Sequence, residues 1–300
     1  MPFTIVRREH LTPNTFLWEV DAPDVAAAAR AGQFVMVRLH DGGERIPLTI
    51  ADFDSTRGTV TTVVQSLGRS TAEMRDKYHE GDTFADFVGP LGMPTEIEAG
   101  DGHVVLVGGG LGVAPVFPQL RAFKLAGHRT TAIVGFRSGE LSFWRDELAE
   151  WADELIVCTD DGSAGRAGLV TEALADVVAS DRPDLAVAIG PMVMMRACGE
   201  VTRPAGVHTV VSLNTIMVDG VEYALVQVHF HSPSEHTIDG IHVDVEAHFV
   251  HKSSTGKLAV VAVMLVQGDA ENAAWAPRAG WLVTAASSVV RRVEFPSGRE

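Results

Sequence analysis

The chain has 300 residues, 46% of them hydrophobic, which is enough for two domains with their own cores. Its formal net charge of −15 argues against nucleic acid and anionic membranes as partners, because Lys and Arg drive binding to both. The N-terminal residues lack the apolar core of a signal peptide, and no run approaches the ~20 apolar residues of a membrane span. The two cysteines lie in unrelated contexts without disulfide-framework spacing, which fits a reducing cytoplasm, so we expect a cytoplasmic protein.

The first ninety residues predict a small antiparallel β-barrel. Short apolar or alternating runs separated by Gly, Asp and Pro turns predict strands. These strands are expected at 33–39, 47–51, 59–65 and 83–88, with helices only at 25–31 and 70–77.

From Gly102 onward, near-continuous apolar strands alternate with amphipathic helices. This rhythm predicts a doubly wound parallel sheet covered on both faces. Strands are expected at 103–107, 130–135, 154–159, 185–189 and 207–213, and helices at 113–126, 141–152, 169–179 and 192–201.

After Gly220 the pattern returns to strands, at 223–231, 243–251 and 258–267, which predicts an antiparallel β segment. We therefore expect three parts: a barrel domain at 1–99, an α/β domain at 100–220, and a C-terminal β segment with its tail at 221–300.

A glycine-rich loop, GGGLGVAP at 108–115, follows the first strand of the α/β part and opens a helix. Glycines let the backbone approach a pyrophosphate, and a helix N-terminus offers amide donors and partial positive charge. An ordinary tight turn between strand and helix is the alternative interpretation.

The barrel and this loop are followed in order by TDDGSAGRAG at 159–168 and AIGPMVMM at 188–195. Together they resemble the ferredoxin–NAD(P) reductase superfamily across residues 1–220. The likeness is greatest to the electron-transfer subunit of dihydroorotate dehydrogenase and to the alpha subunit of sulfide dehydrogenase or NADH-dependent ferredoxin:NADP oxidoreductase. That resemblance implies FAD in the barrel cleft and NAD(P)H on the second domain.

The flavin-binding segments of that family are matched by GQFVMV at 32–37, RIPLTI at 45–50 and GRST at 68–71. The resemblance places Thr49 near the isoalloxazine as a catalytic-site residue and makes Arg45 a charge-assisted phosphate ligand. Arg45 stands four residues before Thr49, whereas the wider superfamily has three, and in a strand this offset reverses the side-chain face. The expected flavin residues are Arg45, Pro47, Leu48, Thr49, Ile50, Gly68, Arg69, Ser70 and Thr71.

The resemblance also assigns residues to NAD(P)H. They are Gly108, Gly109, Gly110, Gly112, Val113, Ala114, Pro115, Asp160, Gly162, Gly190, Pro191 and Met192. A solvated acidic turn is the alternative interpretation for Asp160 and Asp161, and core packing is the alternative for Met192 and its neighbouring methionines.

The implied chemistry is hydride transfer from the nicotinamide to FAD, with the protein fixing the stacking geometry. Relatives then pass electrons to a [2Fe–2S] cluster held by a cysteine-rich segment after the stretch matching 212–220, and that segment is missing here. The chain has two cysteines, Cys158 and Cys198, whereas a cluster usually needs four thiolates, so we expect no iron–sulfur cluster. A beta-type oxidoreductase subunit is an expected partner.

The third segment carries histidines at metal-ligand spacing. His229 and His231 lie two residues apart and share a strand face, and His248 on the next strand could complete a three-nitrogen zinc site. A polar strand face with solvated histidines is the alternative interpretation.

QVHFHSPSEH at 227–236 and EAHFVH at 246–251 resemble the metal-site strands of α-carbonic anhydrases. That likeness implies His229, His231 and His248 as zinc ligands and Gln227 and Glu246 as acceptors that orient ligand rings. It implies Glu235 as a buried catalytic-site carboxylate that orients a threonine hydroxyl. The likeness covers 221–267 alone: the threonine lacks a clear counterpart, Thr284 having little of the motif around it, and the proton-shuttle histidine is unmatched.

Three hypotheses follow. The leading one is an NAD(P)H-dependent FAD oxidoreductase carried by residues 1–220. The second is zinc-dependent hydration of carbon dioxide by the C-terminal histidines. The third is a natural or artificial chimera whose C-terminal piece binds zinc without catalysis and fills the place of the lost cluster segment.

Overall fold

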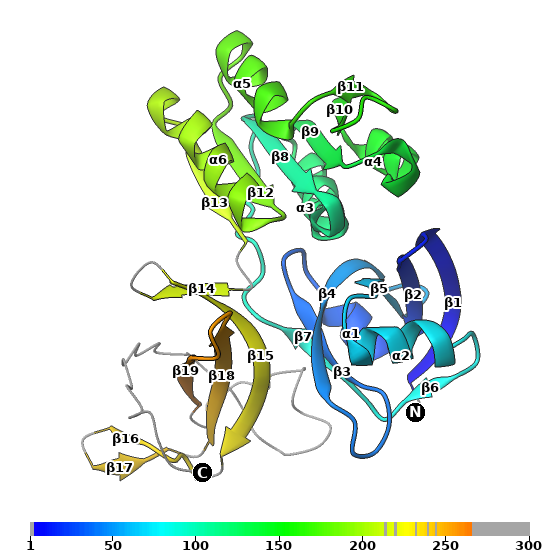
Figure 1. Ribbon diagram of the computed structural model, residues 1–300, viewed down its shortest axis with the longest axis vertical. Helices are drawn as coiled ribbons and strands as arrows, with labels where there is room; N and C mark the ends of the chain where they lie inside the picture. The colour runs from blue at the N-terminus through cyan, green and yellow to red at the C-terminus, as the bar shows by residue number, and fades with distance from the viewer. Residues whose placement is uncertain are drawn as a thin grey trace. The chain divides into compact units, whose positions relative to one another are not determined.

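The computed structural model describes residues 3–212, 215–218, 221–231, 233–238, 240–243 and 245–265. The chain divides into two compact units, Met1–Ser212 and Leu213–Glu300 (Figure 1). The first unit contains two sheets that are joined by a shared buried cluster, and the second unit contains a smaller sheet.

The first sheet is antiparallel and has seven strands in the order β6-β1-β2-β5-β4-β3-β7. Its interior is filled by large side chains such as Phe16, Trp18 and Phe87, which are almost fully buried. The strands are β1 (Phe3–Thr12), β2 (Thr15–Asp21), β3 (Phe34–Arg38), β4 (Arg45–Asp54), β5 (Thr59–Gln65), β6 (Thr83–Phe84) and β7 (Asp86–Leu91), with helices α1 (Pro23–Ala28) and α2 (Arg69–Lys77). The predicted barrel is confirmed.

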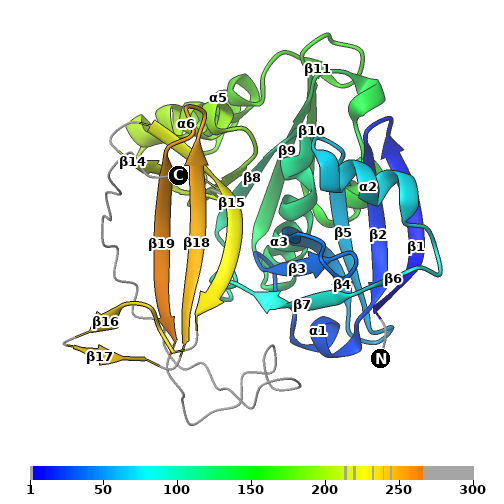
Figure 2. The same cartoon turned by 60° about the horizontal axis from the view of Figure 1, so that its bottom comes forward.

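The second sheet has six parallel strands in the order β11-β10-β9-β8-β12-β13. Figure 2 shows its strands side by side with helices packed against them. The strands are β8 (His103–Gly109), β9 (Arg129–Phe136), β10 (Glu154–Thr159), β11 (Arg166–Ala167), β12 (Leu185–Ile189) and β13 (His208–Val211). The helices are α3 (Val113–Leu125), α4 (Arg145–Trp151), α5 (Val170–Ser180) and α6 (Met192–Thr202), with short 3₁₀ turns at Gly110–Gly112, Gly139–Leu141 and Arg203–Ala205.

Side chains of this sheet alternate between two cores, because successive residues of a strand point to opposite faces. On β8, Val104 and Leu106 pack with α3, while Val105 and Val107 pack with α5 and α6. Both faces are therefore covered, which explains the near-continuous apolar strands and confirms the doubly wound prediction.

The helix predicted at 141–152 is wrong at its start. Leu141 ends a 3₁₀ turn and α4 begins only at Arg145. Between them Trp144 adopts a left-handed conformation, φ 58°, and its ring packs 5.2 Å from that of Phe117. A left-handed residue interrupts a helix, so α4 cannot begin before Trp144. The ring contact of Trp144 is with Phe117 of α3, which is distant in the sequence.

The second unit contains the predicted antiparallel meander, in the order β14-β15-β18-β19. Its strands are β14 (Thr215–Val218), β15 (Val221–His231), β18 (Val245–Ser253) and β19 (Leu258–Leu265), and a separate hairpin is formed by β16 (Thr237–Ile238) and β17 (Ile241–His242). The last two residues of the strand expected at 258–267 lie outside the described residues. Within the described part of the chain, no helix is both long and apolar enough to cross a membrane.

Candidate functional site

The parallel sheet has a topological switch point beside β8. From β8 the chain proceeds to β9, β10 and β11 on one side, and then returns to β12 on the other. In open α/β sheets, ligands bind outside the carboxyl ends of the strands at such a point. The glycine loop after β8 and the Gly190–Pro191 turn after β12 both lie there, because Gly108 pairs with Ile189.

Close packing of these two loops requires their glycines. A Cβ on Gly112 would lie 2.2 Å from the carbonyl oxygen of Ile189, and one on Gly190 would lie 3.1 Å from the Cα of Gly109. At Gly110, with φ +54°, no described atom lies within 4 Å of the Cβ position. The loop is therefore tight toward β12 and open at Gly110, immediately before α3 begins at Val113.

The three methionines at the start of α6 differ in how deeply they are buried. Met195 is buried in the core, and Met194 packs where a Cβ on Gly109 or Gly190 would lie. Met192 is half-buried at the first turn. The core-packing interpretation holds fully for Met195.

The outer face of β4 presents the residues expected to meet a flavin. Arg45 and Pro47 are exposed and Thr49 is half-buried, while Leu48 and Ile50 point into the barrel core. The four-residue spacing thus puts Arg45 and Thr49 on the same face of the strand. Leu48 and Ile50 can reach a ligand on that face only through their backbone.

Arg45 belongs to a small charged group at the barrel edge. Its Nη2 lies 3.2 Å from Oδ2 of Asp86, which also accepts a 2.6 Å hydrogen bond from Nε of Arg38. Arg38 in turn lies 3.4 Å from Asp41. About half of the Arg45 side chain is exposed, so its guanidinium is accessible from solvent while it contacts Asp86.

The GRST segment forms the start of α2. Oγ1 of Thr71 accepts hydrogen bonds from the N–H of Leu67 at 3.0 Å and of Gly68 at 2.9 Å, so this hydroxyl stabilises its own turn. Ser70 donates to Glu44 at 2.5 Å. The first N–H groups of a helix lack intrahelical acceptors, so anion-binding capacity here comes from the backbone beside Gly68 and Arg69.

The loop after β10 carries Asp160, Asp161 and Gly162 in exposed positions. Asp161 accepts hydrogen bonds from the hydroxyl and the N–H of Ser163, at 2.5 Å and 2.9 Å, and these bonds lower the pKa of its carboxyl. Gly162 has φ +71°, a conformation that favours glycine. The solvated-turn interpretation therefore fits Asp161, while Asp160 remains at the carboxyl edge near β10.

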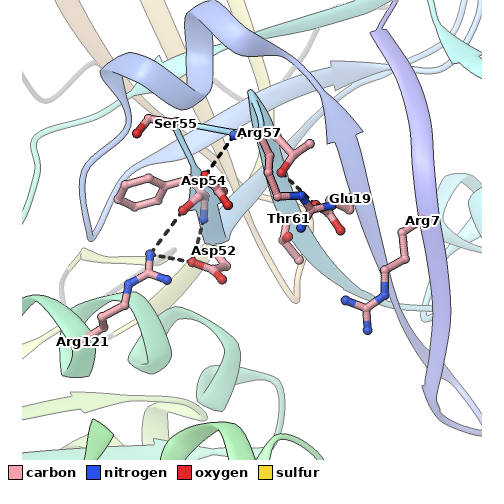
Figure 3. Close-up of a pocket in the computed structure, with 10 residues that line it drawn as sticks. Arg7, Glu19, Asp52, Asp54, Ser55, Arg57, Thr61 and Arg121 are labelled. Carbon is pink, nitrogen blue, oxygen red and sulfur yellow. Dashed lines mark hydrogen bonds and ion pairs between the residues drawn. The ribbon is translucent and has the colours of Figure 1, made fainter. Parts of the chain in front are cut away.

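One interaction was absent from the sequence prediction. Arg121 of α3 lies 2.6 Å from Asp52 of β4, beside a polar pocket of about 310 Å³ (Figure 3). No local motif marks this pair, because its members come from different domains and lie far apart in the sequence.

In the second unit, β15 and β18 pair so that His229 lies opposite His248 and His231 lies opposite Glu246. Nε2 of His248 lies 2.8 Å from Oε1 of the fully buried Glu246. Burial alone raises the pKa of Glu246, but hydrogen bonds from His236 and His248 outweigh it and bring the pKa to about 2. The side chains of Gln227, His229 and His231 lie outside the described residues.

The expectation of a buried carboxylate at Glu235 is wrong. Its side chain is 58% exposed, because it lies in the bend between β15 and β16 and not within a strand. Its Oε2 is 3.9 Å from Nδ1 of His248, and ligand atoms of Glu235, His236 and His248 lie within 4.8 Å of one another. Thr284 lies outside the described residues.

An antiparallel barrel followed by a doubly wound parallel domain is the architecture of FAD- and NAD-binding ferredoxin reductase-like proteins. No family model matches the chain. Its structure matches that of an NADH-dependent reduced ferredoxin-NADP oxidoreductase with a TM-score of 0.67 and 44% identity, covering 73% of this chain and 79% of the other.

Several curated relatives are dihydroorotate dehydrogenase electron transfer subunits or a homolog of one. A Thermotoga maritima homolog of the dihydroorotate dehydrogenase B (NAD(+)) electron transfer subunit is 45% identical over 216 residues, or 72% of this chain and 76% of the relative. The Geobacillus kaustophilus electron transfer subunit is 32% identical over 202 residues, covering 66% and 77%. The chain belongs to this family of electron-transfer subunits in the ferredoxin–NAD(P) reductase superfamily. The resemblance stated for residues 1–220 is confirmed, and that of 221–267 to α-carbonic anhydrase stays a prediction.

Proposed function

We propose that the first unit binds FAD along the outer face of β4 and NAD(P)H at the carboxyl edge of the parallel sheet. Its reaction is hydride transfer between them. The observation that carries this proposal is the pair of glycine turns at the switch point, because α3, which begins there, packs against β4, the strand that bears Thr49. When both groups are bound, the nicotinamide supplies the hydride and the flavin accepts it.

The residues present fit a flavin with a pyrophosphate. Arg45 offers an exposed guanidinium, and the N-terminus of α2 offers backbone N–H groups beside Gly68, where no described atom would obstruct a Cβ. Both are donors suited to phosphate oxygens. Thr49 lies on the same face as Arg45, where its hydroxyl can contact the ring system and help to orient it.

Electrons are proposed to leave through a beta-type partner subunit and not through a cluster in this chain. Both cysteines are buried in the same core, Cys158 on β10 and Cys198 on α6. Burial raises the pKa of Cys158, and it raises that of Cys198 to about 11, which disfavours the thiolate that a metal needs. The division into parts at 1–99, 100–220 and 221–300 belongs to this proposal.

The test is an anaerobic visible spectrum of the FAD-loaded protein before and after addition of NADH or NADPH. We expect the flavin band near ~450 nm to bleach, because the flavin carries the chemistry. A protein that takes up FAD but is reduced by neither nucleotide, or one that takes up no FAD, would overturn the proposal.

A second candidate function is zinc-dependent hydration of carbon dioxide by the second unit. Two observations favour it: His229 and His248 are cross-strand partners, and Oε1 of Glu246 lies 2.8 Å from Nε2 of His248, to which it is hydrogen-bonded. A carboxylate on the far ring nitrogen is the usual arrangement around zinc-bound histidines. Bound zinc would supply activation of water at neutral pH.

Zinc content and hydration activity of wild type, His231→Ala and His248→Ala test this candidate. The expected result is about one zinc per chain in wild type and loss of both zinc and hydration in each variant. Hydration that survives His231→Ala contradicts it. Zinc binding without hydration, together with intact flavin chemistry, identifies the non-catalytic chimera instead.

A further inference from the structure

The helix that follows the glycine loop is packed directly against the barrel. Ala114 and Phe117 of α3 share a buried cluster with Ala51 of β4, and Leu17 and Val63 of neighbouring barrel strands belong to the same cluster. The apolar contact holds the two domains together but is not directional. Directional contacts are needed to fix how far α3 slides or rotates against β4.

Arg121 and Asp52 supply such a contact. Nη2 of Arg121 lies 2.6 Å from Oδ1 of Asp52, and it lies 3.4 Å from the carbonyl oxygen of Phe53, to which it donates. The guanidinium also stacks over the ring of Phe53 at 5.3 Å and that of Phe117 at 5.7 Å. A planar guanidinium held by an anion and two aromatic faces has little freedom to move.

The ion pair of Arg121 and Asp52 is largely buried, and an irregularity in β4 lies beside Asp52. The Arg121 and Asp52 side chains are only 20% and 32% exposed. Burial raises the pKa of Asp52, and the neighbouring Arg121 guanidinium opposes that rise, so Arg121 favours the charged form of the Asp52 carboxyl. The register of β4 against β5 shifts between Ile50 and Asp52, and such bulges commonly redirect a side chain next to an active site.

We propose that Arg121 and Asp52 form a clamp that positions the nicotinamide-binding loop relative to the flavin-binding strand. This inference rests on the function proposed above. Thr49 lies three residues before Asp52 on the same strand, and Arg121 lies two turns of helix, about 12 Å, beyond Val113. Arg121 and Asp52 are therefore positioning residues, since neither is expected to touch the reacting atoms.

A second ion pair beside the same pocket provides a matched control. Arg57 lies 2.6 Å from Glu19, the same separation as in the clamp, but both residues belong to the barrel (Figure 3). Losing this pair removes an ion pair of the same length without releasing α3.

The experiment compares Arg121→Met, the milder Asp52→Asn, the double variant and Arg57→Met with wild type, all loaded with FAD. Anaerobic stopped flow measures flavin reduction over a range of nucleotide concentrations, and hydrogen–deuterium exchange follows α3 and β4 in the same proteins. We expect Arg121→Met to keep its flavin and to lower the limiting reduction rate about 10-fold, since small misplacements of reacting groups are costly. The nucleotide concentration for half-maximal rate should change less than about 2-fold, because the variant keeps the contacts that bind the nucleotide and loses only the geometry of the reacting groups.

Further results are expected if Arg121 and Asp52 act as a clamp. Exchange should rise in both α3 and β4 in Arg121→Met but only around 55–61 in Arg57→Met, whose reduction rate should stay within about 2-fold of wild type. The double variant should be no slower than Arg121→Met alone, because the pair acts as a unit. A wild-type rate in Arg121→Met, or multiplying effects in the double variant, overturns the clamp. A wild-type protein that NAD(P)H does not reduce overturns the proposed function instead, and the exchange comparison still decides whether the clamp exists.

Discussion

Gly112→Ala is expected to lower the rate of flavin reduction by NAD(P)H at least ~100-fold, because it separates the two loops at which the nucleotide is proposed to bind. The new methyl carbon would lie 2.2 Å from the carbonyl oxygen of Ile189 and 2.8 Å from the Cα of Gly190. Backbone atoms cannot rotate away as a side chain can, so β12 and the loop after β8 must move apart. The free energy of unfolding should also fall by about 1–3 kcal/mol, as for other overpacked sites.

Gly112 adopts ordinary helical angles, so the substitution tests crowding and not backbone strain. Gly199→Ala in α6 is the matched control, since no described atom lies within 4 Å of its Cβ position. That change should leave reduction unaffected and stabilise the protein by up to ~1 kcal/mol. Stopped-flow reduction and thermal unfolding of the two variants check this pair of expectations, and equal rates in both would show that the loop contact is not needed.

Arg45→Ala should weaken FAD binding about 10- to 100-fold. A charge-assisted hydrogen bond to phosphate contributes about 1.5–3 kcal/mol, and each ~1.4 kcal/mol is a factor of ten in affinity. The barrel itself should remain folded, because Asp86 keeps its 2.6 Å hydrogen bond with Arg38. Titration of the flavin-free protein with FAD, followed by quenching of flavin fluorescence, measures the change.

Arg145→Ala removes the same charge from exposed α4 and serves as the control for net charge. Its FAD affinity should match that of wild type. If Arg45→Ala also binds FAD as wild type does, the pyrophosphate lies elsewhere, and the N-terminus of α2 becomes the sole candidate contact among those proposed.

The regular elements were predictable wherever the local pattern decides the structure. The strands at 59–65 and 154–159 match β5 and β10 to the residue, because apolar and β-branched runs end at clear turn residues. The start of α4 was not predictable, since Trp144 takes its conformation in a cluster with Phe117 and Phe143. Local propensity does not report such tertiary contacts.

The candidate site shows the same limit. The glycine motif locates the loop, but the reason that Gly112 must be glycine lies on β12, far along the chain. Likewise, the spacing of Arg45 and Thr49 gives their common face only once the strand is known to be regular there. The exposure of Glu235 and the pairing of Arg121 with Asp52 depend on bends and domain packing, which leave no periodic signal in the sequence.

The contact between Arg45 and Asp86 has a consequence for assembly of the holoprotein. Without a bound phosphate, the guanidinium of Arg45 would repel that of Arg38 nearby. Asp86 forms ion pairs with both arginines, and Asp41 forms a further ion pair with Arg38. The barrel thus carries an internal counter-ion where the cofactor's phosphate is proposed to arrive. Without a bound phosphate, the two arginines at this edge are therefore already balanced by two carboxylates of the chain itself.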